Sequence, residues 1–92
     1  MTRNRLIWSE EARAARERLP EEARAAVEQR LEYVREMPRM YAAAQDGRFP
    51  GCRSFWVDPA YRVYYMVAAG GDDVFLRAIV EEAVQELVED AG

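Results

Sequence analysis

Apolar residues in the first third of the chain recur with a helical period. Ser9, followed by two glutamates, predicts a helix N-cap with acids in the first turn, where the helix dipole favours negative charge. This helix should run to about Leu19, and Pro20 suits the first position of a second helix. The second helix should end at Pro38, and its apolar positions are three or four residues apart: Ala23, Val27, Leu31, Val34 and Met37. Residues 9–37 therefore predict a helical hairpin.

The second half of the chain has the short, aromatic-rich apolar runs that are typical of strands. Three runs are separated by turn sequences: Cys52–Val57, Tyr61–Ala68 and Asp73–Val80. Because the turns at 58–60 and 69–72 are short, these runs predict an antiparallel meander. Residues 5–8 predict a further strand at an edge of the meander. Residues 39–51 predict a short helical turn followed by a loop.

These elements predict one domain over residues 1–92, with its core in 5–80 and an α+β fold. The helical hairpin should pack on one face of a three- to four-stranded, largely antiparallel sheet. A last, acidic amphipathic helix is expected at 81–90, continuing an apolar stripe that begins at Val80.

Strand alternation assigns side chains to the two faces of the sheet. In each strand, the alternating row with fewer charged residues is predicted to face the hairpin. Together with the apolar positions of the helix, these rows predict the following buried residues: Trp8, Val27, Leu31, Val34, Trp56, Val63, Tyr65 and Leu76. The opposite face then combines arginines with aromatic side chains: Arg53, Phe55, Arg62, Tyr64, Phe75 and Arg77. This second face is the predicted binding surface.

The amino-acid composition limits which residues can act as metal ligands or as acid–base catalysts. The chain has no histidine, no lysine and a single cysteine, so neither an internal disulfide nor a zinc site is expected, and no cofactor is indicated. Any general acid or base must be Asp, Glu, Tyr, Cys or water. No apolar run is long enough for a membrane span or a secretory leader, which favours a cytoplasmic protein with no membrane partner.

The net charge of −4 comes from the end of the chain, because residues 81–92 carry five acids and no base. All 13 basic residues are arginines. A net acidic chain binds nucleic acid poorly unless its arginines gather on one face.

Several short segments together resemble the RelE/ParE superfamily of bacterial type II toxin–antitoxin systems. They cover about residues 5–80: Ile7-Trp8-Ser9, Leu19-Pro20, Pro38, Gly51-Cys52-Arg53-Ser54, Tyr61-Arg62-Val63-Tyr64-Tyr65 and Val74–Val80. The resemblance implies the α+β fold described above, a toxin, and a cognate antitoxin protein as partner.

The family's ribonucleases cut mRNA on the ribosome with a basic, tyrosine-bearing sheet face. The resemblance makes Arg53, Arg62 and Tyr64 the candidate catalytic residues. The chain departs from the family pattern at Phe55, where a second basic residue is common. It departs again after the last strand, where Glu81-Glu82 replaces a basic residue and no histidine or tyrosine follows Tyr65.

Three functions remain open. The first is a toxin-like protein that acts mainly by protein binding, to an antitoxin and to a target such as DNA gyrase. The second is a ribosome-dependent mRNA endoribonuclease with an arginine-based site. The third is a non-toxic binding or homodimerisation module on the same fold. Alternatively, the C-terminal helix folds over the arginine face and makes it a second small core. Trp8 and Trp56 are interpreted as core anchors, and Cys52 as an inert buried thiol.

Overall fold

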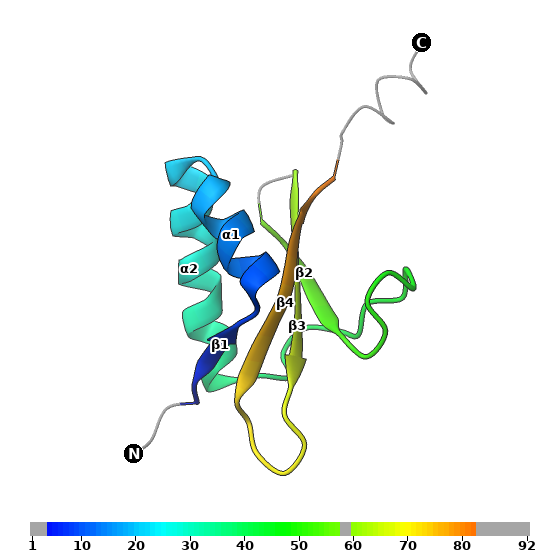
Figure 1. Cartoon of the computed structure of the whole chain (residues 1–92). Helices are drawn as coiled ribbons and strands as arrows, with labels where there is room; N and C mark the ends of the chain where they lie inside the picture. The colour runs from blue at the N-terminus through cyan, green and yellow to red at the C-terminus, as the bar shows by residue number, and fades with distance from the viewer. Residues whose placement is uncertain (1–3, 58–59, 83–92) are drawn as a thin grey trace.

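The computed structural model describes residues 4–57 and 60–82. Along the chain, the elements are β1 (Leu6–Trp8), α1 (Glu10–Arg18), α2 (Glu21–Glu36), β2 (Arg53–Val57), β3 (Tyr61–Val67) and β4 (Val74–Glu81). Both helices lie on the same side of the sheet (Figure 1). Neither is long and apolar enough to cross a membrane. The α+β hairpin-on-sheet prediction is confirmed for this part of the chain.

The helix boundaries follow from capping. The Ser9 hydroxyl accepts the Ala12 N–H at 3.0 Å, so α1 begins where the sequence predicts. Pro20 is the N-cap of α2 rather than its first residue. At the other end, the Met37 N–H donates to the Tyr33 carbonyl at 2.9 Å before Pro38 prevents a further turn. The helical turn expected here is a single hydrogen-bonded turn, in which the Met40 N–H donates to the Met37 carbonyl at 3.0 Å, and the residues after it form the expected loop.

The sheet has the order β1-β4-β3-β2 and is mixed. The last three strands form the expected antiparallel meander, while β1 runs parallel to β4 along one edge. β4 continues to Glu81, so Val80 and Glu81, where the apolar stripe and the predicted helix begin, belong to a strand. The rest of that predicted helix lies outside the described residues.

The main core lies between the hairpin and the sheet. Six of the eight residues predicted to be buried are at most 1% exposed: Val27, Leu31, Val34, Val63, Tyr65 and Leu76. Trp8 is partly buried against the same core. Trp56, expected to be a core anchor, is 45% exposed, and that prediction is wrong.

Trp56 is exposed because β2 has the opposite orientation to the one predicted. Phe55 pairs with Val63, and both are in the core under the helices. Trp56 pairs with Arg62 on the other side, 5.3 Å from its guanidinium. Both alternating rows of this strand contain large aromatic residues, so alternation alone does not decide between them.

A β-bulge changes the orientation of β4 in mid-strand. Tyr65 pairs with Leu76 but Tyr64 pairs with Ala78, which leaves Arg77 unpaired. Beyond the bulge, Ile79 enters the main core, whereas Ala78 and Val80 lie on the opposite face. Strict alternation along the strand predicts Ala78 and Val80 under the helices and Ile79 on the opposite face, so the bulge inverts these three positions.

Ser9 connects the bulge to α1, which predicts the result of removing its hydroxyl. Besides capping α1, it donates a hydrogen bond to the Arg77 carbonyl at 2.9 Å. Ser9→Ala should lower the free energy of unfolding by about 1–2 kcal/mol, measured by urea denaturation. Ser9→Thr keeps the hydroxyl and is the matched control. Equal stability of the wild type and Ser9→Ala would contradict this role.

Candidate functional site

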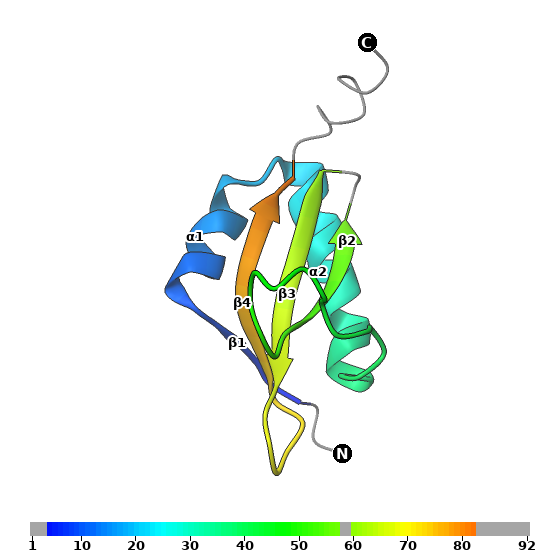
Figure 2. The ribbon, with the colours of Figure 1, turned by 90° about the vertical axis from the view of Figure 1, so that its right-hand side faces the viewer.

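The face of the sheet opposite the helices, here called the helix-free face, is covered in part by a loop. Residues 42–51, here called the capping loop, lie between α2 and β2 and cross in front of β3 and β4 (Figure 2). Two backbone hydrogen bonds attach the first end of the loop to β2 and the residue before it: Ala44 N–H to Cys52 O at 2.8 Å and Ser54 N–H to Ala42 O at 3.3 Å. Near the other end, the Cys52 N–H donates to the Phe49 carbonyl at 3.1 Å. Side chains from the loop then pack onto the sheet.

A second small core lies under this loop. Cys52, Tyr64 and Ala78 are its buried members, with Ala44, Phe49 and Val80 packed against them. A second small core therefore exists on this face among the described residues, while the alternative predicted from the sequence, a core under the C-terminal helix, is not tested. The cover of the observed core comes from the capping loop, whereas the expected cover, the C-terminal helix, lies outside the described residues.

Each of the three guanidinium nitrogens of Arg62 donates a hydrogen bond on this face. Its Nε and Nη2 donate to Ser54 Oγ at 3.2 and 3.1 Å, and its Nη1 donates to Asp46 Oδ2 at 3.1 Å. The guanidinium lies 5.3 Å from the ring centroids of both Trp56 and Tyr64. Only 21% of the side chain is exposed. The arginine is therefore held in place by the chain's own groups.

Tyr64 is fully buried next to Arg62. Its hydroxyl donates to Asp46 Oδ2, and its ring meets the edge of Phe49 at a centroid distance of 4.7 Å. Burial, and then the bond to Asp46, raise the pKa of Tyr64. The bond from Tyr64, followed by that from the Arg48 N–H, lowers the pKa of Asp46. The proton thus stays on the phenol and the charge stays on the carboxylate.

The two buried tyrosines predict an alkaline transition. Burial raises the pKa of Tyr65 as well, and its hydroxyl donates to the Pro38 carbonyl at 2.8 Å. A pKa that is higher in the folded than in the unfolded chain gives stability that is complete below about pH 10 and declines as the pH rises toward the folded values. Phenolate absorbance should show two of the five tyrosines ionising late in the native protein. Tyr64→Phe should remove one, and five tyrosines titrating together would contradict the burial of both.

The predicted site residues divide between the two faces. Arg62, Tyr64 and Arg77 come together at the helix-free face, where Arg77 lies 4.7 Å over the Phe49 ring. Arg53 instead pairs with Tyr65 on the helix side and donates to the Tyr41 carbonyl at 2.7 Å. Phe55 is buried there too. Placing Arg53 and Phe55 beside Arg62 was wrong, because it followed from the inverted orientation of β2.

Sequence reasoning missed the group that organises this site, Asp46. The Asp46-Gly47 pair indicated only a turn, and Gly47 does take a positive φ of 75°. One signal was present: Asp46 is the only acid between Glu36 and Asp58, a stretch that carries three arginines. The ion pair of Arg48 with Glu82 at 2.7 Å was missed as well.

The chemistry of this face is limited. Burial raises the pKa of the Cys52 thiol, which disfavours the reactive thiolate. Within the described ranges, no three acids, cysteines or histidines are grouped to hold a metal ion. In the part of the chain that the structure describes, Asp46 is the carboxylate that contacts both Tyr64 and Arg62. The arrangement binds a carboxylate, which here belongs to the chain itself.

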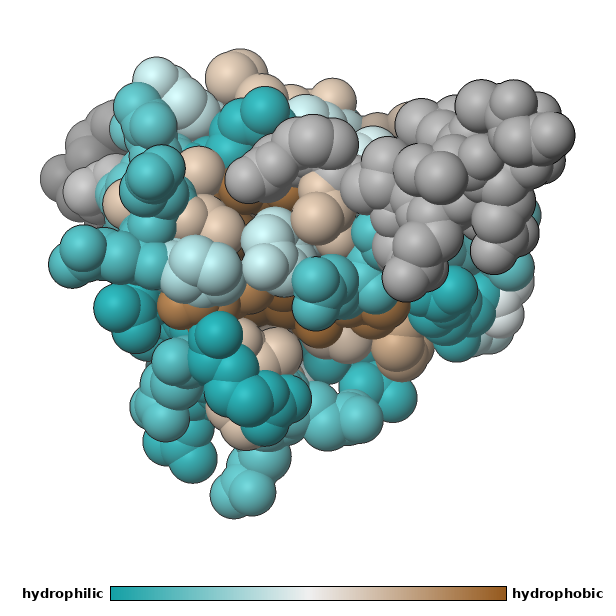
Figure 3. All heavy atoms as spheres, turned by 90° about the horizontal axis from the view of Figure 1, so that it is seen from above, coloured by the Kyte–Doolittle hydropathy of each residue, from teal (hydrophilic) through white to brown (hydrophobic). Residues whose placement is uncertain are grey.

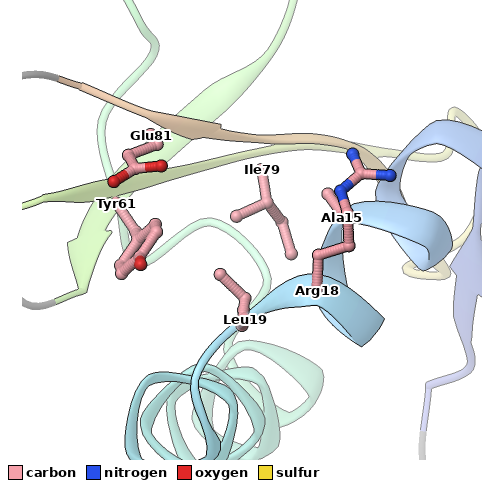
Figure 4. A pocket seen from close by; sticks show the side chains of 6 residues that line it. All are labelled: Ala15, Arg18, Leu19, Tyr61, Ile79 and Glu81. Atoms are coloured by element: carbon pink, nitrogen blue, oxygen red, sulfur yellow. The ribbon is translucent and has the colours of Figure 1, made fainter.

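Three surface hollows formed by described residues lie away from this site. One of about 170 Å³ is at the end of the molecule where α1 ends, with an apolar floor of Leu19 and Ile79 between Arg18 and Glu81 (Figure 4). Seen from above, apolar surface shows between charged side chains (Figure 3). These hollows contain neither Arg62 nor Tyr64.

Solved structures with a similar fold are bacterial toxins. The isolated RelE toxin of E. coli matches with a TM-score of 0.78 and 24% identity, covering 96% of this chain and 94% of RelE. The E. coli RelBE toxin–antitoxin complex matches at 0.74 and 25%, covering 87% and 98%. A YoeB/ParE toxin from Agrobacterium tumefaciens matches at 0.71 and 14%, covering 86% and 99%. No protein-family model and no curated protein matches the chain. The expected structural resemblance to the RelE and ParE toxins is confirmed, and the fold is RelE-like.

Proposed function

We propose that this chain is the toxin-like component of a type II toxin–antitoxin pair and acts by binding proteins, including a cognate antitoxin, without cleaving RNA. The RelE-like fold supports the toxin assignment, and two of the similar structures contain RelE-type toxins with antitoxin or antitoxin peptide. One observation carries the choice of protein binding: Asp46 already neutralises Arg62 and holds the buried Tyr64 hydroxyl.

RNA cleavage through the 2′-hydroxyl needs a base, a cation at the phosphate and an acid for the leaving oxygen. Arg62, in β3, is the candidate cation, but its exposed fraction is small and each of its three nitrogens already donates a hydrogen bond within the chain. Tyr64 has no exposed surface and a raised pKa, so it serves poorly as a base. Asp46 would repel the phosphate.

Growth on induced expression in a bacterium tests the proposal. Expression should arrest growth, and co-expression of a cognate antitoxin should restore it. Translation should continue in the arrested cells, for the wild type as for the control Arg39→Ala, which loses only a surface ion pair with Asp72. Loss of toxicity in Arg62→Ala alone, together with loss of translation, would favour the ribonuclease. No arrest with any variant would favour a non-toxic binding module.

A further inference from the structure

The capping loop is attached firmly at its ends and lightly in the middle. At the first end, Ala44 and Ala42 have backbone hydrogen bonds to Cys52 and Ser54, and near the second end the Cys52 N–H donates to the Phe49 carbonyl at 3.1 Å. Between them, most of the residues at 45–51 are exposed, and Phe49 is the one with a partly buried side chain. The middle is therefore held down by two side chains that reach the sheet, Asp46 and Phe49, and at one side by the pair of Arg48 with Glu82.

The carboxylate of Asp46 makes the central contact. Its Oδ2 accepts from both Arg62 and Tyr64, while its Oδ1 accepts from the Arg48 N–H of the loop itself at 3.1 Å. Removing this carboxylate leaves Arg62 bonded only to Ser54 and leaves the Tyr64 hydroxyl without its acceptor. A buried hydroxyl and a partly buried cation that have lost an acceptor favour a replacement anion.

The sheet beneath Phe49 is apolar. The Phe49 ring packs against the Tyr64 ring, with 4.7 Å between their centroids. The Arg77 guanidinium also lies 4.7 Å from the Phe49 ring centroid. The loop thus fills its site with a carboxylate and, three positions later, an aromatic ring. An occupant of the same site needs both features, which a segment of a protein can supply and a simple anion cannot.

Resting on the proposed function, we infer that the capping loop is a displaceable plug, and that Asp46 occupies in cis a carboxylate site for an acidic segment of a partner protein. The partner's acid replaces Asp46 between Arg62 and Tyr64, and an apolar neighbour replaces Phe49. The face is closed in the free chain and becomes an interface when the partner lifts the loop.

The only cysteine of the chain reports on the plug. Cys52 is 1% exposed, belongs to the small core under the loop, and reacts with a thiol reagent only after that core opens. In the full chain, Asp46→Ala should raise the labelling rate at least about tenfold over wild type, a change of about 1.4 kcal/mol in the opening equilibrium. Asp72→Ala removes the same charge from a surface ion pair and should leave the rate unchanged.

Low concentrations of urea separate local from global opening. A labelling rate that stays flat at low urea indicates opening of the loop alone, whereas a steep rise indicates unfolding of the domain. Equal rates in Asp46→Ala and Asp72→Ala, or labelling of Asp46→Ala only through global unfolding, would overturn the plug.

A fluorescent acidic peptide with a phenylalanine three positions after a glutamate, the spacing of Asp46 and Phe49, tests the occupant. At low salt, Asp46→Ala should bind it at least about tenfold more tightly than Asp72→Ala does, and Asp46→Ala/Arg62→Ala should lose the gain. A gain seen only with a single-stranded RNA oligomer would overturn the protein occupant, as would no gain at all. Both tests use the isolated chain and do not depend on toxicity. A negative result in them therefore contradicts the displaceable loop without contradicting the proposed function, and a negative growth assay contradicts only the proposed function.

Discussion

Replacing Phe55 with alanine is expected to destabilise the domain by about 3–5 kcal/mol, enough to unfold much of a small domain. Phe55 is 4% exposed, and its ring stacks on Tyr41 at 4.8 Å and meets Tyr65 at 6.1 Å. The Arg30 guanidinium lies 5.9 Å from the same ring. Alanine would leave a cavity among rigid neighbours that cannot collapse to fill it. Urea denaturation measures the loss.

Trp56→Ala is the matched control, because it removes a larger ring from the adjacent residue. Trp56 is 45% exposed and contacts mainly the Arg62 guanidinium. Its loss should cost less than about 1 kcal/mol, the range of an exposed cation–π contact. If Trp56→Ala is the more damaging of the two, β2 has the orientation that simple alternation suggested, and the face assigned to Arg53 must be revised.

Replacing Tyr64 with alanine is expected to cost about 3–5 kcal/mol as well, because this tyrosine is the largest buried side chain of the second core. A catalytic tyrosine on an open surface would behave differently, since its removal would abolish activity and leave stability nearly unchanged. Tyr64→Phe should cost about 1 kcal/mol, by losing the hydrogen bond to Asp46 while keeping the packing.

Met66→Ala is the control for Tyr64, because it lies two residues along β3 on the same face. Met66 is 40% exposed, and its truncation should change the free energy of unfolding by less than about 1 kcal/mol. If Tyr64→Ala is as mild as Met66→Ala, the capping loop does not close the face.

The sequence predicts the helical side of the fold well, because its signals are local. Caps at Ser9 and prolines at 20 and 38 mark the helix ends, and the apolar period of α2 identifies the buried positions Val27, Leu31 and Val34. Alternation also orients β3 correctly, since Val63 and Tyr65 enter the main core.

The candidate site is harder to predict, because its geometry depends on non-local contacts. The bulge at Arg77 shifts the register by one residue and has no signature in a run that is apolar on both sides. Asp46 lies in a stretch without periodicity, yet it meets Arg62 and Tyr64, 16 and 18 residues away. A turn residue that pairs with strand residues at this distance becomes visible only once the chain is folded.

Cleavage of mRNA in a reconstituted translation reaction tests the central claim most directly. The account predicts no cleavage beyond that of a reaction without the protein, because Asp46 neutralises Arg62 and the capping loop buries Tyr64. Arg39→Ala provides the surface control for Arg62→Ala. Efficient cleavage that persists in Arg39→Ala and disappears in Arg62→Ala would show an arginine-based ribonuclease and contradict the account.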